Sequence, residues 1–284
     1  MTELLGMPPD LSTHGEVIDQ LIFWIHVIML ALGVGWGAFF LYTLVRFRRG
    51  RNAQANYEGT KSHASSYLEI GVGVIEAVLL IGFAIPLWAQ RIGLESFPDT
   101  KDSVEVQVIA QQFQWNMHYP GVDGVFGRLN PTMIHQTLNP IGKDPADPNG
   151  ADDIVLPQLL VIPENKPVIV HLTSMDVIHS FSLPVLRIKQ DTIPGQSIKI
   201  WFQATQTSEA FKREEFQAGK WESVNKMPDF QVACAQLCGA QHYKMIGKLV
   251  IVTEEEFAGL KTEEDFTNWF VKHVTEWPGP PAKP

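Results

Sequence analysis

The chain has 284 residues, which is enough for one large domain or two modest ones. Its formal net charge of −9 argues against a nucleic-acid partner, because such a partner needs a basic face that neutralises phosphates. Only two cysteines occur, four positions apart, and this excludes a framework of several disulfides.

The first predicted element is a membrane-spanning helix over Leu21–Val45, a stretch that contains no Asp, Glu, Lys or Arg. A helix needs about 20 apolar residues to cross the hydrocarbon core. A cleaved signal peptide is the alternative, but a signal begins with positive charge, whereas residues 1–20 contain four acidic residues and neither Lys nor Arg. We therefore expect a membrane anchor.

A second apolar stretch, Leu68–Ala89, is also long enough to span a membrane and contains two carboxylates, Glu69 and Glu76. The connection between the stretches is basic, with Arg46, Arg48, Arg49, Arg51 and Lys61. The positive-inside rule places this connection in the cytoplasm, so the N-terminus and the region after residue 95 are expected outside. Residues 1–94 are thus predicted to form an N-terminal segment and a transmembrane helical hairpin.

Residues 95–284 have the pattern of an exported β domain. Short apolar runs, several with period-two alternation, are separated by turn residues such as Pro-Gly. The candidate strands are Val104–Ile109, Ile154–Val161, Pro167–Leu172, Ser197–Phe202, Phe230–Ala233 and Lys248–Val252. Many short strands at this spacing predict a sandwich or a barrel.

Three segments of this region do not follow the strand pattern. Insertions are expected at about 121–153, which reads as a surface loop, and at 208–226, which reads as partly helical. A helix is expected over Glu254–Trp277, followed by a disordered Pro-rich tail over Pro278–Pro284.

Four metal-ligating side chains lie within twelve residues: Cys234, Cys238, His242 and Met245. Soft sulfur ligands with imidazole favour copper, and weak Met coordination beside His and Cys is typical of copper electron-transfer sites. A single copper of the blue type needs one cysteine, whereas two bridging thiolates can hold two copper ions that share one electron. His179, at the end of a predicted strand, offers a second imidazole.

Two alternatives compete with copper. The cysteines can form a disulfide, since an exported domain meets an oxidising space. Zinc also binds Cys and His, although Met is a poor zinc ligand and the spacing is unlike a zinc ribbon. Histidines without sulfur neighbours are interpreted as surface or packing residues: His26, His63, His118, His135 and, within a strand, His171.

These residues resemble the second subunit of bacterial-type haem–copper cytochrome c oxidases, a family that carries a dinuclear copper centre called CuA. The resemblance covers the N-terminal hairpin, the Asp-Val-x-His-Ser-Phe-x-x-Pro run at 176–184, residues 189–195 and the Cys-x3-Cys-Gly-x2-His-x2-Met loop. It implies that a cupredoxin-like Greek-key β-barrel follows the membrane hairpin. It also implies the CuA ligands, which are the side chains of His179, Cys234, Cys238, His242 and Met245 and the backbone carbonyl of Gln236.

The resemblance further implies a role as the electron-accepting subunit of an oxidoreductase and translocase. Electrons would come from cytochrome c, or from a haem c-bearing supercomplex partner, and pass to haem in subunit I. Oxygen would be reduced there, at haem and CuB, with proton translocation. Further expected partners are subunit III and the lipid membrane, and the expected location is the bacterial plasma membrane, with the mitochondrial inner membrane as the alternative.

Two positions near the copper ligands depart from the family pattern. Gln236 stands where a Glu usually binds magnesium or manganese at the subunit I interface, and a neutral amide argues against that second metal. Phe113 stands where a Trp is the family's proposed point of electron acceptance, and Trp115 follows it. Either the donor docks differently here, or Phe113 serves adequately as the contact.

The second helix also departs from the pattern. Glu69 matches a family carboxylate at the cytoplasmic mouth of a proton path into subunit I, whereas Glu76 occupies a position where Pro is common. Ionisable groups in a membrane helix rarely face lipid, and residues seven apart share a helix face. Both carboxylates are therefore expected to point at subunit I.

Other functions share part of these features. A freestanding, membrane-tethered copper carrier is the main alternative, although Glu69 and the two-helix anchor favour the oxidase. Quinol oxidase subunit II has the fold without the copper ligands, and a nitrous-oxide reductase would bring a second catalytic domain. No Cys-x-x-Cys-His motif occurs, so the donor haem is expected on a separate protein. From Glu95 onward there are 24 acidic and 16 basic residues, and an acidic face can steer a basic cytochrome c.

Overall fold

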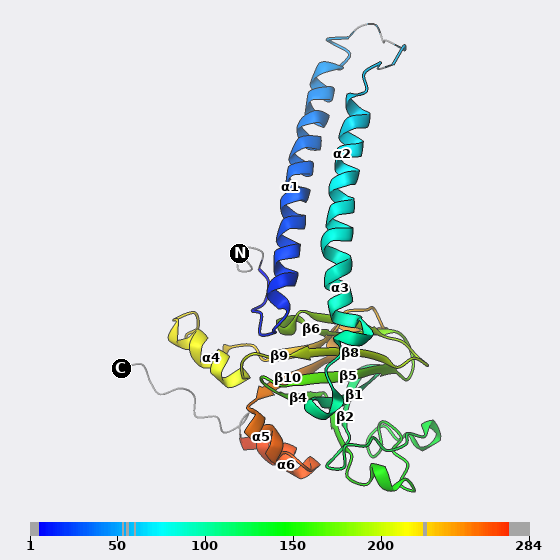
Figure 1. Ribbon diagram of the computed structural model, residues 1–284, viewed down its shortest axis with the longest axis vertical. Helices are drawn as coiled ribbons and strands as arrows, with labels where there is room; N and C mark the ends of the chain where they lie inside the picture. The colour runs from blue at the N-terminus through cyan, green and yellow to red at the C-terminus, as the bar shows by residue number, and fades with distance from the viewer. Residues whose placement is uncertain (1–5, 53, 55–56, 60, 224–225, 273–284) are drawn as a thin grey trace. The chain divides into compact units, whose positions relative to one another are not determined.

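A computed structural model describes residues 6–52, 54, 57–59, 61–223 and 226–272 (Figure 1). These residues divide into two compact units. One contains residues 16–96, and the other combines Gly6–Gly15 with the residues from Phe97 onward. The functional division at residues 94 and 95 stays a prediction.

The first unit contains two helices that are long and apolar enough to cross a membrane, as the sequence predicted. The first is α1 (Gly15–Arg46), and the second runs continuously over Ala64–Ile92. The second has three parts, which are α2 (Ala64–Leu79), a π-helical turn (Leu80–Ala84) and α3 (Ile85–Ile92). Pro86 lacks a backbone N–H and interrupts the regular hydrogen-bond ladder, so a wider turn directly before it is expected.

The second unit is a β-sandwich of two five-stranded sheets. The first sheet has the order β3-β2-β1-β5-β8 and the second has the order β4-β10-β9-β6-β7. The bounds are β1 (Val104–Gln111), β2 (Gln114–Tyr119), β3 (Ile154–Pro157), β4 (Leu159–Pro163), β5 (Pro167–Ser174), β6 (His179–Leu183), β7 (Ile188–Thr192), β8 (Ile198–Gln203), β9 (Phe230–Cys234) and β10 (Ile246–Val252). The β1–β5 and β4–β10 pairs are parallel. The all-β prediction is confirmed.

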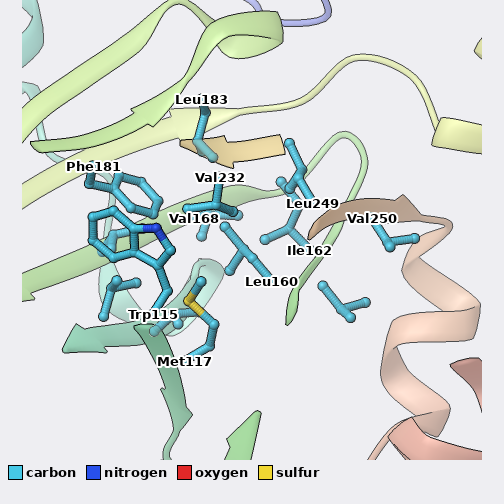
Figure 2. Close-up of a cluster of buried hydrophobic side chains, with 14 of the residues drawn as sticks. Trp115, Met117, Leu160, Ile162, Val168, Phe181, Leu183, Val232, Leu249 and Val250 are labelled. Atoms are coloured by element: carbon cyan, nitrogen blue, oxygen red, sulfur yellow. The ribbon is translucent and has the colours of Figure 1, made fainter. Parts of the chain in front are cut away.

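The core lies between the two sheets. Alternate residues of β1, such as Val106 and Val108, are fully buried, and β2 contributes the buried side chains of Trp115 and Met117. Figure 2 shows Trp115 beside Phe181 of the opposite sheet, and their ring centroids are 5.7 Å apart. A Trp side chain buries a large apolar area, so this contact stabilises the end of the sandwich that holds β6.

The predicted strands need four corrections. Predicted strand Ile154–Val161 is two strands in different sheets, because Gln158 adopts the left-handed conformation (φ 60°) and turns the chain between them. Three further strands, β2, β6 and β7, were not predicted. Two of them contain polar residues that resemble loop composition, namely Ser180 and Ser182 in β6 and the Lys-Gln-Asp run of β7.

The 121–153 segment is fastened to the first sheet rather than loosely attached. The His118 Nε2 atom of β2 lies 2.6 Å from Asp153 Oδ2, and both side chains are fully buried. The backbone N–H of Gly127 donates to the same carboxylate oxygen at 2.8 Å. The Phe126 ring lies between two histidine rings, at 5.1 Å from His118 and 5.9 Å from His171.

Short helices occupy two other predicted segments. Within 208–226, α4 (Ser208–Gln217) begins after Thr207, whose side chain caps it. The predicted helix Glu254–Trp277 is instead two helices, α5 (Glu254–Gly259) and α6 (Glu263–Phe270), and each begins with a capping box. A second cap at Thr262 restarts the helix after a break, and this explains the difference. Residues 273–277 and the predicted tail 278–284 lie outside the described residues.

The segment before α1 is part of the β-sandwich unit. The Leu11 N–H donates to the Val185 carbonyl at 2.8 Å, and the Thr205 N–H donates to the Leu11 carbonyl at 2.9 Å. Leu11 is buried in the core. Along the sequence, the chain therefore leaves the sandwich unit at the start of α1 and returns to it at Phe97.

Candidate metal centre

Two segments of the second sheet bring the predicted ligands together. Strand β6 begins at His179 and pairs with β9, which ends at Cys234. The loop from Cys234 then returns to β10, and a hydrogen bond from the Cys234 N–H to the Met245 carbonyl (3.2 Å) closes it. The adjacent β strands therefore fix one imidazole and one sulfur, and a short closed loop carries the rest.

The ligand atoms converge around the two sulfurs. Cys234 Sγ and Cys238 Sγ are 3.8 Å apart, and both cysteines are free, so they do not form the predicted alternative disulfide. His179 Nδ1 lies 3.9 Å from Cys234 Sγ, and His242 Nδ1 lies 3.5 Å from Cys238 Sγ. The Cys234 thiol donates to the Gln236 carbonyl at 3.2 Å.

Met245 completes the cluster from the core side. Its Sδ lies 3.8 Å from Cys238 Sγ, and the residue is fully buried. The ligand atoms of His179, Cys234 and Cys238 all lie within 4.8 Å of one another, which is close enough for metal binding. The three other predicted ligand side chains, those of His179, His242 and Met245, thus lie beside the two cysteine sulfurs.

Burial disfavours the charged form of the Cys238 thiol. Burial and the neighbouring Cys234 raise the pKa of Cys238 to about 11. A bound cation reverses this preference, because a coordinating thiol loses its proton. Two thiols, two imidazoles and a thioether are soft or intermediate donors that suit copper, and a Met beside them is unlike a zinc site.

A carboxylate orients the buried His179 ring. Asp176 Oδ1 lies 2.9 Å from His179 Nε2, so the other ring nitrogen, Nδ1, is the one that faces sulfur. Partial burial raises the pKa of Asp176. Hydrogen bonds from His179 and from the backbone N–H groups of Gln112 and Val177 lower it by more, so the net pKa is below its usual value. Asp176 is the first residue of the motif at 176–184, but that motif alone indicates no role for it, although its place three residues before a histidine was a usable signal.

The remaining predicted residues lie elsewhere. Trp115 is fully buried with its ring edge-on to His179 at 6.2 Å, so it cannot contact a docking protein directly. Phe113 is half-buried in the turn before β2. Glu69 and Glu76 lie on α2, on one helix face, in the other compact unit.

Comparison with known proteins identifies the family. Residues 104–220 match the family "Cytochrome C oxidase subunit II, periplasmic domain". The alternative cytochrome c oxidase subunit 2 of Bradyrhizobium diazoefficiens is 31% identical over 262 residues, which cover 90% of this chain and 83% of that protein. The cytochrome c oxidase subunit 2 of Cereibacter sphaeroides is 28% identical, with 89% and 78% covered.

Among solved structures, the periplasmic domain of subunit II of cytochrome oxidase from Bradyrhizobium japonicum aligns with 57% of this chain and 91% of its own, at 26% identity and a TM-score of 0.35. The family assignment comes from the extended sequence match and not from this superposition. The two candidate membrane helices and the sandwich with its His–Cys–Cys group agree with it. The chain therefore belongs to the cytochrome c oxidase subunit II family and is a membrane-anchored electron-transport subunit of a haem–copper oxidase, a complex that also contains subunit I.

Proposed function

We propose that this chain holds a dinuclear CuA centre that accepts electrons from cytochrome c, or an equivalent haem donor, and passes them to haem in subunit I. Oxygen is then reduced to water in subunit I, coupled to proton translocation. The observation that carries the proposal is the pair of free sulfurs 3.8 Å apart, each with an imidazole Nδ1 within 3.9 Å. A site for one blue copper does not need the second cysteine.

The chain offers six donors for this centre. They are His179 Nδ1, Cys234 Sγ, the Gln236 carbonyl, Cys238 Sγ, His242 Nδ1 and Met245 Sδ. Two copper ions held by these donors would supply a one-electron couple whose charge change is shared between them. Burial of His179 and Met245 keeps water from the inner side of the site.

Phe113 is our candidate for the point at which electrons enter from the donor. It is half-buried, and its ring packs against Gly239, directly after Cys238, so that a Cβ built at Gly239 would lie 3.0 Å from Phe113 Cζ. Trp115 is buried beside His179, and we propose that it supports the copper centre by packing against that ring. An unchanged rate of electron acceptance in a Phe113→Trp variant would favour simple contact over a changed docking mode.

We place the chain in a bacterial plasma membrane, with the N-terminus and the sandwich on the periplasmic face. Two independent observations support this orientation. The basic connection between the helices favours the cytoplasm, and Gly6–Gly15 belongs to the same compact unit as the sandwich. Subunit III and a haem c-bearing supercomplex partner remain proposals from the family resemblance.

Glu69 and Glu76 are proposed to face subunit I. Glu69 would start proton uptake, and Glu76 would hydrogen-bond to the partner, since unpaired carboxylates facing lipid are costly. Normal proton pumping in a Glu69→Gln oxidase would remove the first role. At the copper loop, the neutral Gln236 is proposed to leave magnesium or manganese unbound, and a Gln236→Glu variant that gains manganese would support this.

The decisive experiment is metal analysis of the full-length chain purified in detergent. We expect two coppers per chain and an electron paramagnetic resonance spectrum of one electron shared by two equal copper nuclei. One copper per chain, or a disulfide between Cys234 and Cys238 in the working protein, would overturn the proposal. The full chain is required because Gly6–Gly15 is part of the sandwich unit.

A further inference from the structure

Gln112 lies between β1 and β2 and contacts both segments that carry the copper donors. Its backbone N–H donates to Asp176 Oδ2 at 2.7 Å. Its side-chain Nε2 donates to the backbone carbonyl of Cys238. One residue of the β1–β2 turn therefore connects the β5–β6 segment, which leads into His179, with the loop between β9 and β10.

The bridge reaches the imidazole through one carboxylate. Asp176 Oδ1 lies 2.9 Å from His179 Nε2, and its Oδ2 accepts the Gln112 N–H. The Val177 N–H also donates to Oδ1 at 2.7 Å. The orientation of the His179 ring and the position of the Cys238 backbone are therefore coupled through two hydrogen-bonding groups of Gln112.

The backbone of Gly239 lies close to the Gln112 side chain that forms this bridge. Its φ is +137°, and a Cβ built there would lie 2.8 Å from Gln112 Nε2 and 3.0 Å from Phe113 Cζ. A side chain at this position would push the copper loop away from the β1–β2 turn. The loop backbone thus lies directly against Gln112, as a bridge to the Cys238 carbonyl requires.

We propose that Gln112 is a positioning residue for electron transfer, which holds the Cys238 loop in register with the Asp176–His179 pair. The inference rests on the proposed copper centre and deepens it. Gln112 contacts no donor atom of the metal, so it acts through Asp176 and the Cys238 backbone. Partners of this outer kind orient metal ligands, and their loss typically costs about 10–100-fold in metal affinity or activity.

The test compares two matched variants of the full-length chain, Gln112→Met and Gln114→Met. Met has nearly the length of Gln but no N–H, and the backbone hydrogen bond to Asp176 survives. Gln114 is the first residue of β2, and its Nε2 donates to Asn116 Oδ1 at 2.7 Å instead of to the copper loop. We expect Gln112→Met to release copper to a chelator at least about tenfold faster than Gln114→Met.

Two further readouts separate positioning from general stability. The metal-free variants should unfold at similar denaturant concentrations, whereas the paramagnetic resonance spectrum should change only in Gln112→Met. Asp176→Asn has one acceptor oxygen where the carboxylate has two, so it cannot accept from both the Gln112 N–H and His179, and the bridge is broken from its other end. Its effect on copper release should be non-additive with that of Gln112→Met, because the two residues are in contact.

The possible failures are distinguishable. Equal copper release from Gln112→Met and Gln114→Met, with a copper-loaded wild-type chain, would overturn this inference alone. Strictly additive effects of Gln112→Met and Asp176→Asn would also overturn it. A wild-type chain that binds no copper would overturn the proposed function and this inference together.

Discussion

Two buried histidines in this protein each lie against an aspartate, yet their second ring nitrogens face different groups. His118 Nε2 is 2.6 Å from Asp153, and its Nδ1 is 2.9 Å from the side-chain amide of Gln107. His179 Nε2 is 2.9 Å from Asp176, but its Nδ1 faces Cys234 Sγ at 3.9 Å. The first ring has both nitrogens beside polar oxygens, whereas the second has one nitrogen that faces a cysteine sulfur.

The carboxylates differ in the same sense. The Asp153 side chain is fully buried and holds the 121–153 segment to the sheet, whereas the Asp176 side chain is 31% exposed and contacts His179. Burial and a carboxylate therefore do not distinguish the structural histidine from the proposed copper ligand. The environment of the second nitrogen does, because metal ligation needs one unprotonated ring nitrogen with other donors beside it.

The largest expected effect follows removal of the His179 ring. In His179→Ala we expect loss of the copper centre and a fall in electron transfer that exceeds the 10–100-fold typical of outer-partner loss. The metal-free chain should also lose some unfolding free energy, because the ring is fully buried and hydrogen-bonds to Asp176. Copper content and cytochrome c oxidation by the assembled oxidase measure the effect. Full copper content in this variant would mean that the two histidines do not differ as proposed.

Removal of the His118 ring should have the opposite pattern. His118→Ala removes the imidazole that hydrogen-bonds to the buried Asp153 carboxylate, and we expect a loss of about 1–3 kcal/mol in the free energy of unfolding. Copper content should stay at the wild-type level if the protein folds. The control is His135→Ala, at an exposed histidine of the 121–153 segment. It should lower the free energy of unfolding by about 1 kcal/mol or less. Denaturant unfolding of the full chain gives both values.

The contrast also explains what the sequence could and could not predict. The hairpin and the Cys–His–Met loop were predictable, because hydrophobic length and ligand spacing are local properties. The His118–Asp153 pair joins residues 35 positions apart, across a segment whose polar composition indicated only a surface loop. The role of Asp176 depends on the turn before β6, a strand whose buried serines concealed it.

A smaller effect concerns pH. Burial lowers the pKa of His118 and outweighs the hydrogen bond and charge of Asp153, which raise it, and the charge of Lys143 lowers it further. The unfolded chain therefore binds more protons below the ordinary histidine pKa of about 6.5, so stability is present above that pH and is lost as pH falls towards the folded pKa.

The metal-free wild type should accordingly lose unfolding free energy as pH falls below about 6.5, with a His118 contribution of at most about 1.4 kcal/mol per pH unit. That contribution should be absent in His118→Ala. Denaturation midpoints at several pH values measure the two slopes. Parallel slopes would mean that His118 keeps the same proton affinity in both states.

The smallest effect tests whether the 121–153 segment is independent of the copper centre. Phe126 packs between His118 and His171, with ring centroids 5.1 and 5.9 Å away, and His171 is held by Glu105 at 2.7 Å. Phe126→Leu keeps an apolar side chain but removes both ring contacts, so we expect a loss of about 1 kcal/mol in unfolding free energy. Copper release should not change, because none of these residues contacts a copper donor. Faster copper release in Phe126→Leu would show that the outer face of the first sheet also supports the metal loops, and the two histidine sites would then be coupled.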